Sequence, residues 1–224
     1  MNYRQEFRNP KLIRDVLAKM SVDNKVTIME VCGSHTMAIS RTGLRDVLPE
    51  KLELVSGPGC PICVTPNDYL EAALKLARRE KVMITTFADL LRVPTAESSL
   101  QLEKSRGCDI RTVYSPLDAV EIARNHPERE VVFLAIGFET TAPTIALSVK
   151  QAKSFALTNF SILQAVKTMP PVMKKLAGAQ DIKLDGFLCP GHVSSIIGVQ
   201  PYEFLAAEYN LPGVIAGFEP GDIV

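Results

Sequence analysis

Residues 131–141 read Val131-Val132-Phe133-Leu134-Ala135-Ile136-Gly137-Phe138-Glu139-Thr140-Thr141, an unbroken apolar run that ends in a glycine, a carboxylate and two hydroxyls. A helical pattern over residues 144–155 follows it. An apolar run without alternation is typical of a strand buried on both faces, as in parallel sheets that helices cover on each side. This stretch therefore predicts an α/β fold in which a polar loop follows the strand.

The same alternation of apolar runs and amphipathic stretches continues along the chain. Strands are predicted at residues 26–31, 52–56, 82–86, 110–114, 131–136, 161–166, 186–189 and 214–216. Helices are predicted at residues 68–79, 117–125, 144–155, 171–177 and 201–209. We expect two Rossmann-like domains with mostly parallel sheets and a site in the cleft at the carboxyl ends of the strands. The polar, proline-containing break at residues 126–130 places the division between domains 1–126 and 127–224.

Composition narrows the class of protein. The 224 residues carry 25 basic and 25 acidic side chains, and this zero net charge gives no case for binding nucleic acid or an anionic membrane. No run approaches the ~20 apolar residues of a membrane span. The charged amino terminus lacks the apolar segment of a secretory signal. The odd count of five cysteines indicates reduced thiols and a cytoplasmic location rather than a disulfide framework.

Four of the five cysteines and two of the three histidines fall in loops that follow predicted strands. Cys32 follows the strand at 26–31 and precedes a helix that begins near Ser34, so the helix macrodipole favours its thiolate form. His35 is placed to hydrogen-bond that thiolate or to ligate a metal. The alternative is a buried structural cysteine with a capping histidine.

Cys60-Pro61-Ile62-Cys63 follows the tight turn Gly57-Pro58-Gly59. Two cysteines at this spacing close a small disulfide or bind one metal ion. The internal proline is typical of dithiol oxidoreductases, whose redox couples are labile. Half of a zinc site and a pair of structural cysteines are the alternatives.

Two loops in the second half of the chain have comparable positions. Cys189 ends the strand at 186–189, and His192 follows it as an acid–base group, a gate over the site or an ordinary loop histidine. Backbone N–H groups together with Thr140 and Thr141 are suited to hold an anion or a small diatomic ligand. Glu139 is a candidate proton relay or a partner of His192, whereas helix capping is the alternative for the two threonines.

The combination of these motifs resembles the hydrogenase maturation factor family HypD, and the resemblance runs from about residue 30 to the end of the chain. The matching stretches are Cys32-Gly33-Ser34-His35-Thr36, Gly57-Pro58-Gly59-Cys60-Pro61-Ile62-Cys63, Arg92-Val93-Pro94, Val113-Tyr114-Ser115-Pro116-Leu117-Asp118-Ala119, Gly137-Phe138-Glu139-Thr140-Thr141, Cys189-Pro190-Gly191-His192-Val193 and Gly217-Phe218-Glu219-Pro220.

The resemblance implies a scaffold with redox chemistry rather than a turnover enzyme. Members of this family help to build the Fe(CN)2CO unit of [NiFe]-hydrogenases in a complex with the small chaperone HypC, and they receive cyanide through HypE. By resemblance, Cys32 binds the iron together with a cysteine of HypC, His35 tunes that ligand, and Cys60 and Cys63 form a thiol–disulfide couple. The remaining site residues expected to approach the cleft from the second domain are Glu139, Thr140, Thr141, Cys189 and His192.

The chain departs from the family pattern in three respects. Family members carry a carboxyl-terminal [4Fe-4S] domain with four cysteines, and no such set follows Cys189, which indicates an interrupted chain. Ala88 and Thr95 stand where the resemblance leads us to expect glycines, and Gly221 replaces a larger apolar residue. Two other functions stay open on the sequence: a thiol–disulfide oxidoreductase that uses Cys60 and Cys63, and a structural zinc or partner-binding module.

Overall fold

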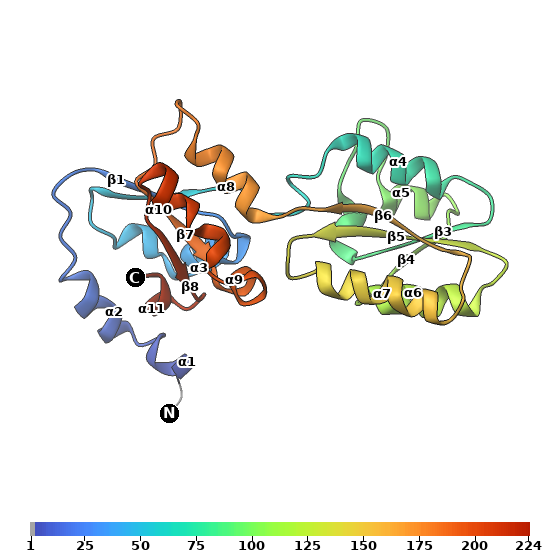
Figure 1. The fold of residues 1–224 in the computed structure, drawn as a ribbon, viewed down its shortest axis with the longest axis horizontal. Helices are drawn as coiled ribbons and strands as arrows, with labels where there is room; N and C mark the ends of the chain where they lie inside the picture. The colour runs from blue at the N-terminus through green and yellow to red at the C-terminus, as the bar shows by residue number, and fades with distance from the viewer. Residues whose placement is uncertain (1–2) are drawn as a thin grey trace. The chain divides into compact units, whose positions relative to one another are not determined.

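The computed structural model describes residues 3–224, which form two compact units (Figure 1). Unit 1 contains the chain up to Cys60 together with Thr168–Val224, and unit 2 contains Pro61–Lys167. Each unit holds a four-stranded sheet in which all neighbouring strands are parallel. The predicted α/β fold with two Rossmann-like domains is confirmed.

The boundaries of the two units differ from the predicted division between residues 126 and 127. Strand β5 (Glu130–Gly137) pairs with β3 (Val82–Thr86), so the break at 126–130 lies inside unit 2. Strand β7 (Gly186–Pro190) pairs with β1 (Val26–Glu30), which returns the last quarter of the chain to unit 1. A polar break marks a surface loop in either arrangement, and strand pairing across long connections leaves no local signal.

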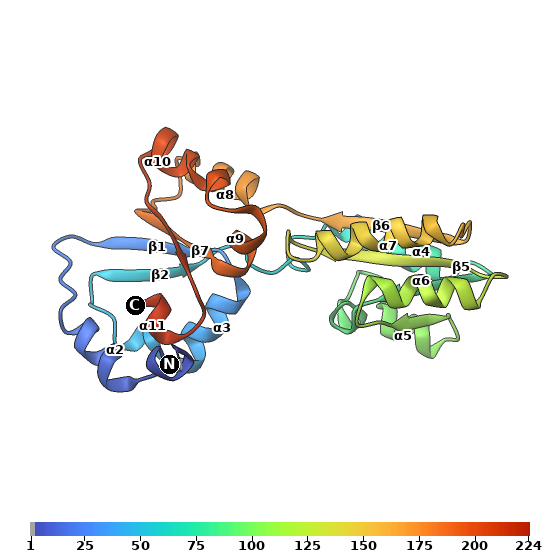
Figure 2. The ribbon, with the colours of Figure 1, turned by 60° about the horizontal axis from the view of Figure 1, so that its bottom comes forward.

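The sheet of unit 1 has the order β2-β1-β7-β8, with β2 at Leu52–Ser56 and β8 at Gly213–Ala216. Helices α2, α3 and α11 lie on one side of this sheet, and α8 and α10 lie on the other (Figure 2). The helical segments of unit 1 are α1 (Tyr3–Glu6), α2 (Pro10–Leu17), α3 (Gly33–Thr42), η1 (Leu44–Asp46), α8 (Met169–Ala177), α9 (Gly191–Ile197), η3 (Gln200–Tyr202), α10 (Phe204–Tyr209) and α11 (Pro220–Ile223). The predicted helix at 201–209 is thus a short 3-10 turn followed by α10.

The sheet of unit 2 has the order β4-β3-β5-β6, with β4 at Ile110–Thr112 and β6 at Phe160–Val166. Apart from Glu130, every residue of β5 is buried, as the unbroken apolar run predicts. The helical segments of unit 2 are α4 (Asn67–Ala77), η2 (Ala88–Arg92), α5 (Leu100–Ser105), α6 (Pro116–Asn125) and α7 (Ala142–Ser154). Among residues 3–224, none of the helices has both the length and the apolar character that a membrane crossing requires.

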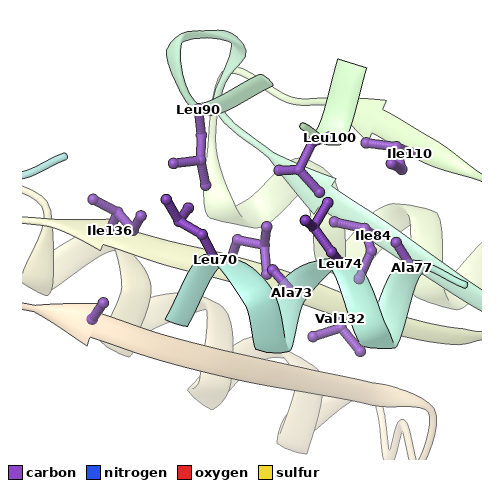
Figure 3. Close-up of a cluster of buried hydrophobic side chains, with 12 residues drawn as sticks. Leu70, Ala73, Leu74, Ala77, Ile84, Leu90, Leu100, Ile110, Val132 and Ile136 are labelled. Atoms are coloured by element: carbon purple, nitrogen blue, oxygen red, sulfur yellow. The ribbon is translucent and has the colours of Figure 1, made fainter. Parts of the chain in front are cut away.

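Helix α4 shows how the sequence pattern builds the core of unit 2. Leu70, Ala73, Leu74 and Ala77 recur at the spacing of one helical face, and all four are buried. They pack with side chains of β3 and β5, among them Ile84, in one apolar cluster (Figure 3). A separate cluster that includes Val113, Ala119, Phe133, Ala135 and Ile145 lies under α6 and α7 on the opposite face of the sheet. The sheet therefore has a packed layer on both sides, which holds its strand ends in place.

Candidate functional site

Cys32 lies between the end of β1 and the first turn of α3, where it is the N-cap residue in an extended conformation. Its side chain is buried, with 4% of its surface exposed. The amide of Gly33 donates a hydrogen bond to the carbonyl of Gly59 over 3.1 Å. A Cβ atom on Gly59 would lie 2.5 Å from the carbonyl carbon of Cys32. The Cys32 loop and the loop before Cys60 therefore touch through their backbones, and glycine at position 59 permits that approach.

The imidazole of His192 lies beside the Cys32 thiol. Its Nδ1 lies 3.8 Å from Sγ of Cys32 and its Nε2 lies 4.0 Å away. The two residues meet because β1 and β7 are neighbours in the sheet, with Glu30 opposite Leu188. Both strands run in parallel, so their carboxyl-terminal loops emerge at the same edge. The thiol and the imidazole form a pair inside unit 1.

His35 points from the first turn of α3 into the interior of unit 1 and is fully buried. Its Nε2 lies 2.8 Å from the carbonyl oxygen of Gly217, which requires the proton to be on Nε2. The ring of Phe218 contacts the rings of both histidines, with centroids 4.8 Å from His35 and 5.2 Å from His192. The loop after β8 therefore holds the two imidazoles in place.

Burial disfavours the charged form of both histidines. Burial lowers the pKa of His35 below its usual value, although the carbonyls of Gly217 and Ala216 oppose this effect. Burial also lowers the pKa of His192, and the neighbouring His35 lowers it further. A neutral imidazole keeps one nitrogen lone pair, so it accepts a proton or binds a metal ion near neutral pH.

Cys189, a predicted site residue, occupies a different kind of environment. It is the last residue but one of β7 and has no exposed surface, and its Sγ faces β8, 3.4 Å from where a Cβ atom on Gly213 would lie. Desolvation raises the pKa of its thiol to about 12. Because metal ions and nucleophilic chemistry require the thiolate, this cysteine has the character of a core residue.

Cys60 and Cys63 lie where the chain passes from unit 1 to unit 2. Cys60 is half-buried and ends the first segment of unit 1, whereas Cys63 is exposed and belongs to unit 2. Thr65 closes the turn around Cys63 with two hydrogen bonds. Its amide donates to the carbonyl of Ile62 over 3.0 Å, and its hydroxyl donates to the carbonyl of Pro61 over 2.8 Å. Exposure gives Cys63 the access that a reactive thiol requires. The thiol–disulfide couple stays a prediction.

Glu139, Thr140 and Thr141 follow β5 in unit 2. Glu139 is buried, and Thr141 is the N-cap residue of α7, although its side chain makes no capping hydrogen bond. The amide of Thr141 donates to the carbonyl of Phe138 over 3.0 Å, which closes the turn. A Cβ atom on Gly137 would come within 2.5 Å of the Thr141 side chain, so glycine is required there. The predicted ligand-holding and relay roles of these three residues stay predictions.

Two residues that belong to the Cys32 environment carry no assigned role on sequence grounds. Phe218 lies in a loop that the sequence marks as a motif, but its contact with both histidines depends on the pairing of β8 with β7. Glu30 ends β1 and is fully buried, although glutamate is a residue that proteins rarely bury. The sequence shows only that Glu30 lies two residues before a candidate ligand, and it gives no sign that the carboxylate is buried.

A groove of about 670 Å³ lies beside the Cys32 loop within unit 1. Its lining includes Met37 and Arg41 of α3 together with Phe218 and Pro220, which follow β8. Met37 exposes 52% of its surface. The groove thus combines apolar surface with a cationic side chain, a mixture that is common in protein interfaces.

Comparison with known proteins identifies the family. The model of HypD, described as the hydrogenase formation hypA family, matches residues 9–224. The chain is 44% identical over 233 residues to hydrogenase maturation factor HypD of Rhodobacter capsulatus, with 100% of this chain and 62% of that relative covered. It is 46% identical over 235 residues to HypD of Rhizobium leguminosarum bv. viciae, covering 100% of this chain and 61% of the relative, and 40% identical over 233 residues to HypD of Escherichia coli (strain K12), covering 100% and 62%.

The chain therefore spans about three-fifths of the length of these relatives. The family model covers both units, including the Cys32, His35 and His192 loops of unit 1 and the loop after β5 in unit 2. A match of this extent, with relatives at these identities, means that the chain belongs to the HypD family.

Proposed function

We propose that this chain forms the part of a hydrogenase maturation factor that holds iron during assembly of the Fe(CN)2CO unit. In this proposal Cys32 is the protein's ligand to the iron, which is cargo rather than a resident cofactor. The observation that carries it is the 3.8 Å approach of His192 Nδ1 to Sγ of Cys32. Membership of the HypD family supplies the hydrogenase context.

The chemistry of the pair suits this role. Thiolates are good ligands for iron in its lower oxidation states, but a thiol must first lose its proton. A neutral His192 beside the thiol accepts that proton as the iron–sulfur bond forms. The negative charge of the thiolate is then neutralised by the iron. Low exposure of Cys32 also keeps bulk water and oxidants away from the metal.

The proposal includes two partners. A chaperone resembling HypC brings a second cysteine thiolate to the iron, and the groove lined by Met37, Arg41 and Phe218 is the surface of unit 1 offered to it. A donor resembling HypE supplies the cyanide ligands. Cys60 and Cys63 form the thiol–disulfide couple of this proposal. The exposure of Cys63 supports this role, because an attacking thiol must be reached by its partner.

The test is anaerobic co-purification of the full-length protein with the HypC-like chaperone. Iron is then measured, and infrared bands are recorded in the cyanide and carbonyl stretching region. The wild type is expected to carry iron and these bands, and Cys32→Ala is expected to lose both. Cys108→Ala is the matched control, because it removes a thiol from unit 2 and leaves Cys32 in place. Cys108 is half-buried and donates a hydrogen bond to Glu103.

Retention of iron and of the infrared bands by Cys32→Ala would refute the proposal. Reduction of a generic disulfide by metal-free protein, unaffected by Cys32→Ala and abolished by Cys63→Ser, would instead favour a thiol–disulfide oxidoreductase. Tight zinc binding lost with Cys60→Ser or Cys63→Ser would favour the structural zinc module.

A further inference from the structure

The buried carboxylate of Glu30 accepts hydrogen bonds from three segments of unit 1. Glu30 is 0% exposed and is the last residue of β1. It accepts hydrogen bonds from the hydroxyls of Thr36 and Ser56, each over 2.6 Å, and from Nη2 of Arg45 over 3.1 Å. A buried carboxylate is tolerated when charge-assisted hydrogen bonds and an opposite charge satisfy its oxygens, and all three donors here serve that purpose.

Two of these donors, Thr36 and Ser56, come from the segments next to Cys32 and Cys60. Thr36 lies one helical turn after Cys32, at the start of α3. Ser56 ends β2, four residues before Cys60. The main chain of Glu30 takes part as well, because its carbonyl accepts the amide of Gly57 over 2.8 Å. The side chain and the main chain of one residue thus hold the loops that lead to both cysteines.

We infer that Glu30 is a positioning residue that fixes the Cys32 loop against the loop before Cys60. A carboxylate offers about four lone-pair sites, so one side chain can hold donors from three directions. Neither an apolar side chain nor a neutral amide of the same size can accept all three. The consequence for iron assembly rests on the function proposed above, but the positioning itself depends only on the contacts of unit 1.

Glu103 in unit 2 offers a matched comparison. It is 3% exposed, and it accepts a hydrogen bond from a serine, Ser98, over 2.6 Å. It also pairs with two arginines, Arg78 and Arg106. Removing the charge of Glu103 therefore perturbs a buried carboxylate network of the same kind. This network, however, contacts neither the Cys32 loop nor the loop before Cys60.

The experiment measures alkylation of individual cysteines by iodoacetamide in reduced, metal-free protein, quantified by peptide mass spectrometry. The variants are Glu30→Gln, Thr36→Val and Ser56→Ala, with Glu103→Gln as the control. Cys189 is the internal reference, since it lies in the same unit and is fully buried. Alkylation of a buried thiol tracks local opening, so losing a hydrogen bond to the carboxylate is expected to raise the rate about tenfold.

The expected pattern is specific for each variant. Glu30→Gln accelerates alkylation of both Cys32 and Cys60, Thr36→Val acts mainly on Cys32, and Ser56→Ala acts mainly on Cys60. Alkylation of Cys189 stays at its wild-type rate in all of them, and Glu103→Gln changes none of the three rates. The milder Thr36→Val and Ser56→Ala variants carry the test if Glu30→Gln does not fold.

Two results would overturn the inference. One is a Cys32 rate within about twofold of wild type in folded Glu30→Gln or in Thr36→Val. The other is equal acceleration of Cys32 and Cys189, which would show general destabilisation of unit 1 rather than release of one loop. The alkylation rates are measured without iron or a partner. Their outcome therefore does not depend on the result of the iron-binding test.

Discussion

The Nδ1 atom of His192 lies 3.8 Å from Sγ of Cys32, although 160 positions separate the two residues in the chain. Adjacent parallel strands, β1 and β7, bring them to one edge of the sheet. Phe218, from the loop after the next strand, packs against the imidazole. The fold of a single unit thus sets the position of an imidazole beside this thiol.

If His192 takes the proton from Cys32, its removal slows iron capture. His192→Gln keeps a polar side chain of similar length but does not accept a proton. We expect iron loading near pH 7 to slow by about 100-fold, the usual contribution of a positioned base. Loading is expected to recover as the pH is raised, because hydroxide then removes the proton. Stopped-flow measurement of Fe(II) binding between pH 6.5 and 9 tests this, and a uniform loss at every pH would contradict it.

Cys189 is expected to behave as a core residue. Its raised pKa, about 12, and its complete burial predict negligible alkylation in the native state at pH 8. Cys189→Ser places a hydroxyl in an apolar site and is expected to cost about 1–3 kcal/mol of unfolding free energy. Cys189→Ala is expected to cost less and to leave iron content unchanged. Urea unfolding together with iron analysis checks both variants, and loss of iron from Cys189→Ala would restore this cysteine to the site.

The two histidines are expected to make unit 1 sensitive to acid. The pKa of His35 in the folded protein lies below the value of about 6.5 expected in the unfolded chain. Below pH 6.5 the unfolded state therefore binds more protons, and the free energy of unfolding falls until the pH reaches the folded pKa. His192 acts in the same direction. His35→Gln does not titrate, so its unfolding free energy is expected to change less than that of the wild type between pH 7.5 and 5.5 in urea titrations. Equal changes in the two proteins would count against this assignment.

Gly59 is expected to tolerate no side chain. The Cβ atom of Gly59→Ala would overlap the backbone of Cys32 and the amide of Gly33, where nothing can move without displacing the loop. We expect a loss of about 1–3 kcal/mol, together with faster alkylation of Cys32. Gly178→Ala is the matched control, because its Cβ atom would meet only the Tyr209 ring and a carbonyl at 3.3 Å or more. Similar unfolding free energies for the two variants would show that the loops separate easily.

The sequence predicts individual elements of this protein well and their partners poorly. The run from Val131 to Ile136 is apolar without interruption, and the structure places it in a buried central strand. The four apolar positions of α4 likewise predict the face that packs on the sheet. Pairing of β7 with β1 depends on packing between segments far apart in the chain, so the domain division at residue 126 does not follow the sheets.

The candidate site shows the same limit. Cys32, His35 and His192 follow strands closely in the sequence, and that position alone identifies them. Their mutual contact requires knowledge of the strand order, and the burial of Cys189 requires knowledge of which strand covers it. An acidic residue at a strand end is usually solvated, so the sequence does not single out Glu30, and the converging donors account for its burial.

The interruption of unit 1 by unit 2 has a consequence for biosynthesis. Residues 61–167 form a contiguous unit that can fold as soon as they leave the ribosome, whereas β1 has to wait for β7 before its second edge is paired. Pairings between distant segments form slowly, because the entropy of closing the intervening loop is lost before the contacts are gained. Cys32 therefore meets His192 only after residues 61–167 have been translated, so a shorter nascent chain presents this thiol without the imidazole.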